Sequence, residues 1–235
     1  METITNTKEK LVLKGEISES LANAIRRSVS EIPVLAIDEI ELYKNDSALY
    51  DEIIANRLGL VPLVTEKSMN SKTKIEFKLS REGPCTVFSG DLKGPADVVV
   101  QDIPITLLGE GHKLELVATA VLGKGINHAK FIPGLCYYRH LSEVKASSDI
   151  DKIIQGSKFA LIKPIKSGSK WICDLNDSEI EMIQRIDKSA VSDAKEMLFV
   201  IESYGNMPAK DIFQGALDAL SDNLEEFEKF VGKNI

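Results

Sequence analysis

Near the start of the chain the spacing of the apolar residues changes from that of a helix to that of a strand and back to that of a helix. Proline and glycine residues mark the ends of the helical segments. One stripe at near-helical spacing predicts a first helix and consists of Leu21, Ile25, Val29 and Ile32. Ser18 or Ser20 can cap this helix at its start, and Pro33 ends it. A strand is predicted over 34–43, and a second helix over 49–58 stops before a glycine. The pattern therefore predicts helix, strand and helix in this order.

The remainder of the chain is rich in strand patterns and ends in helical ones. Further strands are predicted over 11–13, 72–79, 97–101, 112–121, 159–163 and 197–202. A short helix is predicted over 176–186, and a long one over 209–231 follows Pro208. This arrangement suggests two domains, one built from both ends of the chain and the other inserted into it. The pattern alone does not establish that topology.

Composition narrows the class of protein. The chain has 235 residues, of which 43% are hydrophobic and 28% charged, and its net charge is −7. An acidic chain is a poor candidate for broad contact with nucleic acid, because phosphate binding needs clustered Lys and Arg. No apolar run is long enough to span a bilayer, and the first residues, METITNTKEK, lack the features of a signal peptide. We therefore expect a cytoplasmic protein without extensive DNA contact and without membrane association.

Short motifs along the whole chain carry a family resemblance. The first block contains NAIRR at 23–27, EIP at 31–33, AIDE at 36–39, YDE at 50–52 and RLGLVP at 57–62. The middle contains EGPCTV at 82–87, SGDL at 89–92, DIPI at 102–105, LGKG at 122–125 and HAKF at 128–131. The end contains FVIES at 199–203 and PAKDI at 208–212. Together, and in this order, they resemble the family of D subunits of archaeal DNA-directed RNA polymerase, to which bacterial alpha and its eukaryotic counterparts are related.

The resemblance implies a fold and a function. It implies an α+β protein with a helix-and-strand dimerisation domain over 1–43 and 192–235, and an inserted β-rich domain over 44–191. It implies a non-catalytic assembly-platform subunit that forms a heterodimer with a smaller alpha-like subunit, L. In this family the platform also docks the large subunit, which is called B, and the small subunits N and P.

The last helix carries an apolar stripe with a period of about 3.5 residues, as in helices that pack along one another. Spacing alone fits an intramolecular core as well as a partner surface. The resemblance favours a dimer face made by the first and last helices. Its predicted residues are Leu21, Ile25, Val29, Phe213, Leu217, Leu220, Leu224 and Phe227.

Arg26 and Arg27 are adjacent, so their side chains point about 100° apart on a helix. An arginine pair on a helix is most often simply solvated. Here the two residues fall on the Arg-Arg of the family motif, which implies that they dock the large subunit. A planar guanidinium suits such a contact with a carboxylate or a carbonyl.

We find no catalytic or metal-binding set in the sequence. Five acids lie close together, but no His, Lys or Ser nearby completes an acid–base site: Asp38, Glu39, Glu41, Asp51 and Glu52. The segment 109–113 lacks the spacing of a phosphate-binding loop, and the three histidines are scattered. Some family members carry an iron–sulfur cluster or a zinc loop, but the three cysteines here form no paired motif. We expect no cofactor. The alternatives are an enzyme centred on these acids and a homodimer such as bacterial alpha forms.

Overall fold

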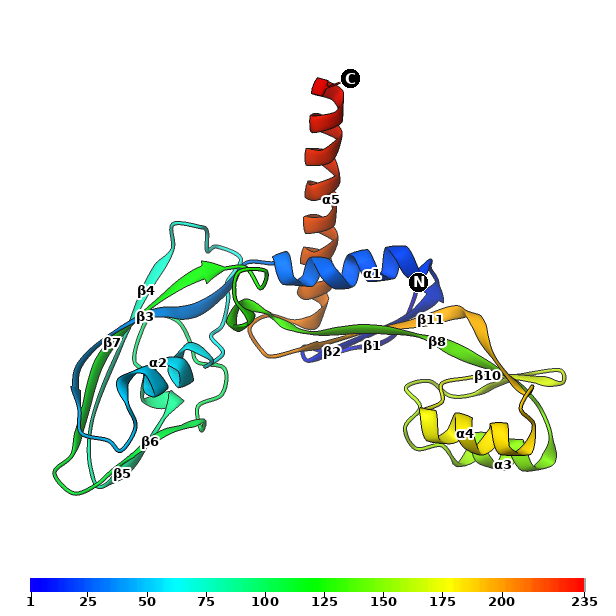
Figure 1. Cartoon of the computed structure of the whole chain (residues 1–235), viewed down its shortest axis with the longest axis horizontal. Helices are drawn as coiled ribbons and strands as arrows, with labels where there is room; N and C mark the ends of the chain where they lie inside the picture. Colours follow the sequence, from blue (N-terminus) through cyan, green and yellow to red (C-terminus); the bar gives the residue numbers. More distant parts are fainter. Residues whose placement is uncertain (235) are drawn as a thin grey trace.

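The molecule is elongated, with a central unit between an inserted unit and a small lobe, and one long helix projects from the centre (Figure 1). The computed structural model describes residues 1–234 and places side chains through residue 232. Its mixture of strands and helices confirms the predicted α+β class. Along the described residues, no helix combines the length and the apolar character needed to cross a membrane.

An antiparallel sheet of six strands, in the order β1-β2-β11-β8-β10-β9, forms the base of the central unit and extends through β10 and β9 into the small lobe. The strands are β1 (Glu2–Asn6), β2 (Lys10–Glu16), β8 (Gly134–Lys145), β9 (Ile165–Ser167), β10 (Lys170–Cys173) and β11 (Val191–Ser203). Strand β11 lies between β2 and β8, with Phe199 opposite Leu13 on one side and opposite Tyr138 on the other. The two ends of the chain therefore share one sheet.

Three helical segments cover one face of this sheet: α1 (Glu19–Ser28), the 3-10 turn η1 (Val29–Glu31) and α5 (Ala209–Asn234). Because neighbouring residues on a strand point to opposite faces, Phe199 and Ile201 pack under the helices while Leu198 and Val200 enter a second apolar cluster. The continuous apolar run in β11 thus serves a strand that is buried on both faces.

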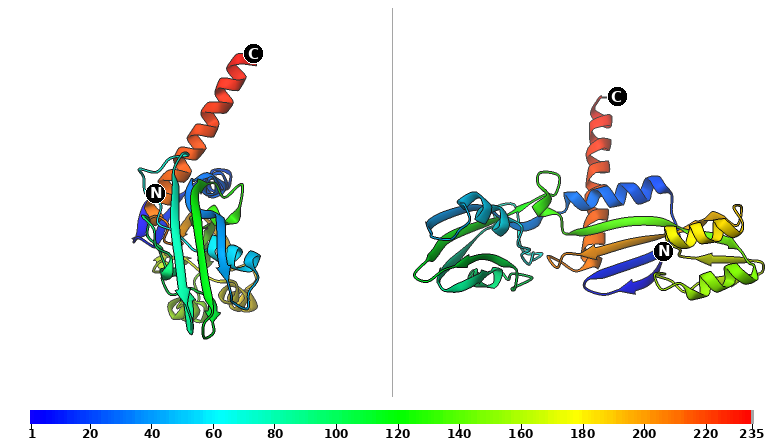
Figure 2. Two further views of the ribbon diagram at one scale, coloured as in Figure 1. Left: turned by 90° about the vertical axis from the view of Figure 1, so that its left-hand side faces the viewer. Right: turned by 60° about the horizontal axis from the view of Figure 1, so that its bottom comes forward.

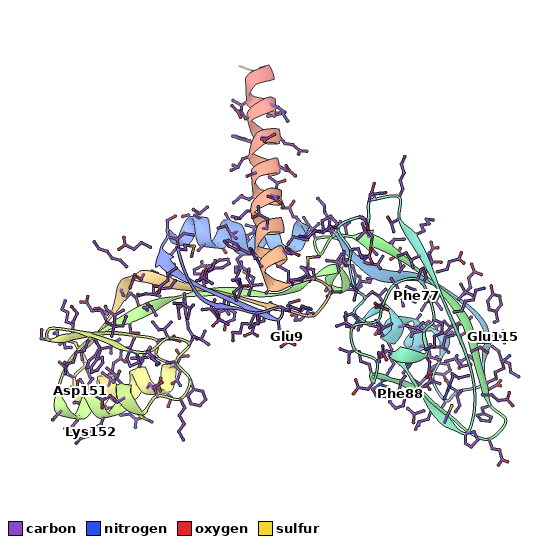
Figure 3. All side chains as sticks on the ribbon, turned by 180° about the vertical axis from the view of Figure 1, so that it is seen from behind. Glu9, Phe77, Phe88, Glu115, Asp151 and Lys152 are labelled. Carbon is purple, nitrogen blue, oxygen red and sulfur yellow. The ribbon has the colours of Figure 1, made fainter. Side chains whose placement is uncertain are left out.

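The inserted unit contains a three-stranded sheet, β3-β7-β4, and a two-stranded one, β5-β6. Its elements are β3 (Val34–Asn45), α2 (Asp51–Gly59), β4 (Lys74–Glu82), β5 (Cys85–Phe88), η2 (Ser89–Asp91), β6 (Pro104–Leu108), β7 (Lys113–Gly123) and η3 (Ala129–Phe131). Its core surrounds Leu35, Ile54, Leu58 and Phe77, all of them fully buried. Figure 3 labels Phe77 among these side chains.

The unit boundaries differ from those predicted at 43/44 and 191/192. Strand β3 pairs with β7 along its whole length, from Val34 opposite Gly123 to Asn45 opposite Leu114, so residues 34–43 belong to the inserted unit. Strand β8 pairs with β11 and returns the chain to the central sheet at Gly134. Strand pairing is a long-range property, so the local pattern that predicted these strands did not show which sheet each one joins.

Residues 146–190 form the small lobe at the far end of the central sheet (Figure 2). It contains α3 (Ser148–Gly156) and α4 (Asp177–Ile186) together with β9 and β10, around a core that includes Ile150, Ile154 and Ile183. The predicted helix over 176–186 is α4, and Asn176 caps it. The strand predicted over 159–163 is wrong, since these residues form no strand and include bends. The strand predicted over 97–101 is reduced to a single bridge between Val98 and Leu63.

A buried asparagine joins the inserted unit to the central unit. The Asn206 side chain, 4% exposed, donates a hydrogen bond of 2.9 Å to the carbonyl of Leu63. The backbone N–H of Thr65 donates to the Asn206 carbonyl at 2.8 Å, and the Thr65 hydroxyl accepts from the Leu35 N–H at 3.0 Å. Gly205, with φ +95°, turns the chain so that Asn206 reaches this position. We call this set of contacts the Asn206 latch.

Candidate functional site

Helix α1 presents one face to the core and another to solvent. Ser18, one of the two serines predicted for this role, caps it by accepting the Leu21 N–H at 3.3 Å. Ile25 and Val29, each 3% exposed, pack into the core of the central unit, whereas Leu21 is 47% exposed. A side chain with almost no exposed surface has none left to bury against a partner. Ile25 and Val29, which were predicted for the dimer face, therefore belong to the chain's own core in this structure.

A histidine fastens the first turn of α1 to the sheet. One ring nitrogen of His140 lies 3.0 Å from the Glu19 carboxylate and the other lies 3.1 Å from the Ala194 carbonyl. The hydrogen bond to Glu19 is the main cause that raises the pKa of His140 above its ordinary value. The protonated imidazole has two N–H donors and can satisfy both acceptors at once.

Helix α5 divides into a packed half and a projecting half. Ile212 and Ala216 are fully buried, and Phe213 meets Phe199 edge to face, with ring centroids 5.8 Å apart. Leu217 and Leu220 are partly buried against the same core. The spacing left open whether the stripe is intramolecular core or a partner surface. In the structure, the first half of the stripe is intramolecular core.

Beyond Leu220 the helix leaves the body of the molecule, and residues 221–230 are exposed. Leu224 and Phe227 continue the stripe with 61% and 65% of their surface exposed. Figures 1 and 3 show this half projecting away from the sheet, with its side chains pointing outward, and Asn223 near its start still bonds to Glu31 of η1. The predicted residues Leu224 and Phe227, with Leu21 on the neighbouring helix, are thus the ones with surface available to a partner.

The arginine pair lies in the last turn of α1 and is exposed. The Arg26 guanidinium donates two hydrogen bonds, of 3.1 and 2.9 Å, to the side-chain oxygen of Asn23. Among the described residues, no carboxylate lies within 4 Å of either Arg26 or Arg27, although the chain forms many other ion pairs. Both guanidinium groups therefore retain donors that an acidic partner can use.

A hollow of about 370 Å³ lies beside this pair, and we call it the Arg hollow. Its lining comes from η1 and α1, the turn after β7, the start of β8 and the loop after β11: Arg26, Arg27, Val29, Ser30, Glu31, Ile126, Ile132, Gly134, Leu135, Cys136 and Tyr204. Burial raises the pKa of the Cys136 thiol to about 12, so it remains a neutral, weakly polar group in this lining. Sequence reasoning found the two arginines but none of the apolar residues opposite them, because those lie about 100 residues or more further along the chain.

Three of the five acids considered as a catalytic set make ordinary structural contacts. Asp38 pairs with Lys130 at 2.7 Å, Glu41 accepts the Tyr43 hydroxyl at 2.9 Å, and Asp51 accepts from Asn45 at 2.8 Å. Within residues 1–234, no group of three or more His, Cys, Asp or Glu side chains is arranged to hold a metal ion. The arrangement therefore offers surfaces for contact, namely the projecting half of α5 and the Arg hollow.

Comparison with known proteins gives one consistent result. Residues 35–133 match the model of the RNA polymerase Rpb3/RpoA insert domain, close to the limits that strand pairing gives the inserted unit. DNA-directed RNA polymerase subunit Rpo3 of Thermococcus kodakarensis is 32% identical over 93% of this chain and 91% of its own length. Subunit Rpo3 of Pyrococcus furiosus is 35% identical over 93% of this chain and 90% of its own length. That of Methanothermobacter thermautotrophicus is 31% identical over 96% of each chain.

Proposed function

The chain belongs to the Rpo3 family of archaeal DNA-directed RNA polymerase subunits, and on this basis we propose that it is a non-catalytic platform on which the polymerase assembles. In the letter nomenclature of these polymerases, such a chain is called D. The observation that carries the proposal is the projecting half of α5. A helix with an exposed apolar stripe gains stability when a second chain covers the stripe.

We propose that the smaller alpha-like subunit L covers this stripe and forms a heterodimer with the chain. Leu224 and Phe227 are the contacts on α5, and Leu21 extends the surface on α1. Phe213, Leu217 and Leu220 support the base of α5 through the chain's own core, so they hold the helix in position for its partner.

The remaining contacts follow from the same resemblance. Arg26 and Arg27 dock the large subunit (B), and their lack of a carboxylate neighbour within the described structure supports this role. Loops of the inserted unit receive the small subunits N and P. The complex works in the cytoplasm.

We propose that the chain holds no metal or cluster of its own. The iron–sulfur cluster of some family members needs several thiolates around one point. Cys136 and Cys173 lie in different apolar clusters, one under α1 and α5 and the other in the small lobe. Burial raises the pKa of the Cys173 thiol to about 12, as it does for Cys136. These residues do not fit a shared cluster.

The first test changes the projecting half of α5. In the double variant Leu224→Asp with Phe227→Asp, two carboxylates stand where apolar contact is expected, and an unpaired buried charge is costly. We expect the variant to remain folded and to lose subunit L on co-purification, whereas the wild-type chain and L recover at 1:1. A double variant on another face of the same helix, Asp222→Asn with Glu226→Gln, should keep L.

Two outcomes would contradict this proposal. One is 1:1 recovery of L with the Leu224→Asp and Phe227→Asp variant. The other is a wild-type chain that forms a stable homodimer through α5, as bacterial alpha does, and does not exchange it for L. Sizing of the chain alone and with L separates the two cases.

The second test reverses the arginine pair. Arg26→Glu with Arg27→Glu changes two exposed side chains, so the free energy of unfolding should shift by less than about 1 kcal/mol. Like charges now face the acidic partner, so incorporation into polymerase should fall while the heterodimer with L persists. Normal incorporation of this variant would remove the docking role of the pair.

A further inference from the structure

We propose that the Arg hollow seats an apolar side chain of the polymerase chain that docks on the arginine pair, and that a carboxylate on the same segment of that chain binds the pair. The proposal rests on the docking role given to Arg26 and Arg27 above and adds the chemistry of what binds there. The occupant is thus a protein segment in which an acidic residue stands beside a large aliphatic or aromatic one.

Three large apolar side chains of the hollow are exposed to solvent. Ile126 is 69% exposed, Tyr204 54% and Leu135 46%, and all three line the same depression. They come from the turn after β7, the loop after β11 and strand β8, so they converge only in the folded chain. Exposed apolar side chains that gather around a depression mark a contact site for another protein more often than single exposed residues do.

The walls of the hollow are fixed by backbone hydrogen bonds. The Ile126 N–H donates to the Ser30 carbonyl at 3.0 Å, which ties the turn to η1. The Tyr204 N–H donates to the Pro133 carbonyl at 2.9 Å, which ties the loop after β11 to the start of β8. Because these segments are already held together, an incoming side chain does not have to order them.

The polar half of the hollow selects for a carboxylate. The Arg26 guanidinium donates to the neutral side-chain oxygen of Asn23, and no carboxylate of the described residues lies within 4 Å of Arg26 or Arg27. Glu31 lies at the same rim, but it accepts a hydrogen bond of 2.9 Å from Asn223 on α5. A carboxylate from outside is therefore the natural bidentate partner for a guanidinium here.

The hollow is continuous with the proposed dimer surface. The contact between Glu31 and Asn223 joins its rim to α5 just below Leu224. A protein segment that binds in the hollow consequently lies next to the subunit that covers α5. A nucleic acid backbone is a poorer occupant, because apolar side chains supply neither positive charge nor hydrogen-bond donors to phosphates. The chain also carries a net charge of −7.

The experiment is a competition inside the assembling polymerase. Wild-type and variant chains are co-expressed with the other subunits, the polymerase is purified through a tag on the large subunit, and mass spectrometry measures the ratio of the two forms. The variant Ile126→Asn with Leu135→Asn removes the apolar walls without adding charge. We expect it to be under-represented by about tenfold or more, as for the loss of one buried aliphatic contact. Leu107→Asn is the matched control, since Leu107 is 70% exposed on β6 and lies outside the hollow, and it should stay near parity.

The arms of the experiment separate this inference from the docking role itself. If the arginine reversal is excluded from polymerase while Ile126→Asn with Leu135→Asn stays at parity, the inference is overturned and the docking role stands. If both variants stay at parity, both proposals fail. If only the apolar variant is excluded, the carboxylate part of the inference is overturned.

A photo-crosslinking residue in place of Ile126 identifies the occupant directly. Attachment to a large-subunit peptide that contains an acidic residue beside an apolar one supports the inference. Attachment to nucleic acid, or to a peptide without an acid, overturns it. Circular dichroism and retention of L check that every variant remains folded.

Discussion

The Asn206 latch gives a prediction whose magnitude follows from the structure. The variant Asn206→Ala removes the donor to the Leu63 carbonyl and leaves that acceptor buried without its partner. An unsatisfied buried group of this kind costs about 1–3 kcal/mol. For a chain of 235 residues, each kcal/mol lowers the melting temperature by about 2–4 °C, so we expect a decrease of about 2–12 °C.

Thermal unfolding and hydrogen exchange measure the effect together, on the proposed 1:1 complex with L, since we expect the exposed stripe of α5 to favour self-association of the isolated chain. The Thr65 N–H is bonded to the Asn206 carbonyl and should exchange faster by about 5- to 150-fold if the junction between the units opens more readily. Amides in the middle of β11 should be much less affected, because they are paired on both sides within the central sheet.

Two further variants make this prediction sharp. Asn206→Asp replaces the donor with a second acceptor opposite the Leu63 carbonyl and should destabilise more than alanine does. Asn223→Ala is the matched control, since that asparagine is exposed and bonds to Glu31 at the surface, and its effect should stay below about 0.5 kcal/mol. If Asn206→Ala also stayed within about 0.5 kcal/mol of the wild type, the latch would not join the two units as we describe.

The remaining predictions concern pH, metal content and the base of α5. The hydrogen bond to Glu19 raises the pKa of His140, so its stabilising contribution is complete below the unfolded value of about 6.5 and is lost as pH rises through the folded value. His140→Gln should therefore flatten the fall in melting temperature above that pH, and equal slopes would contradict this. Elemental analysis of the purified heterodimer should give far less than one equivalent of zinc or iron for this chain, and a stoichiometric value would refute the cofactor-free proposal. Ile212→Ala should lower the free energy of unfolding by about 2–5 kcal/mol, measured by urea titration, because this side chain of α5 is fully buried in the core of the central unit.

The sequence predicted helices and strands better than it predicted which other segments each of them contacts. The alternation that predicted the strand over 72–79 corresponds to β4, and Ser18, one of the two cap residues predicted for the first helix, caps α1. These features depend on neighbours within a few residues. The prediction of a strand over 159–163 was wrong because these residues pair with no other strand. They lie in an irregular segment of the small lobe.

For the candidate sites too, the local pattern was predictable and the tertiary packing was not. The spacing of Phe213 to Phe227 identified a helix with one apolar face, but it did not reveal where along that face the protein body ends. Only the packed structure separates Ile212 and Ala216, which are buried, from Leu224 and Phe227, which are exposed. Likewise, the Arg-Arg motif marked one side of the Arg hollow, and the residues opposite it come from segments that only tertiary structure brings near.

The position of β11 in the central sheet sets an order for events during synthesis of the chain. Strands β2 and β8 both pair with β11. Leu13 of β2 can therefore pair with Phe199 only after the ribosome has added roughly 190 more residues. The inserted unit pairs β3 with β7 and β4 and can close before β11 exists. Helix α5 follows β11 directly, so its projecting half emerges only when the sheet beneath it can be completed. The exposed apolar surface of α5 is therefore made last, when the strands of the sheet beneath it are already present.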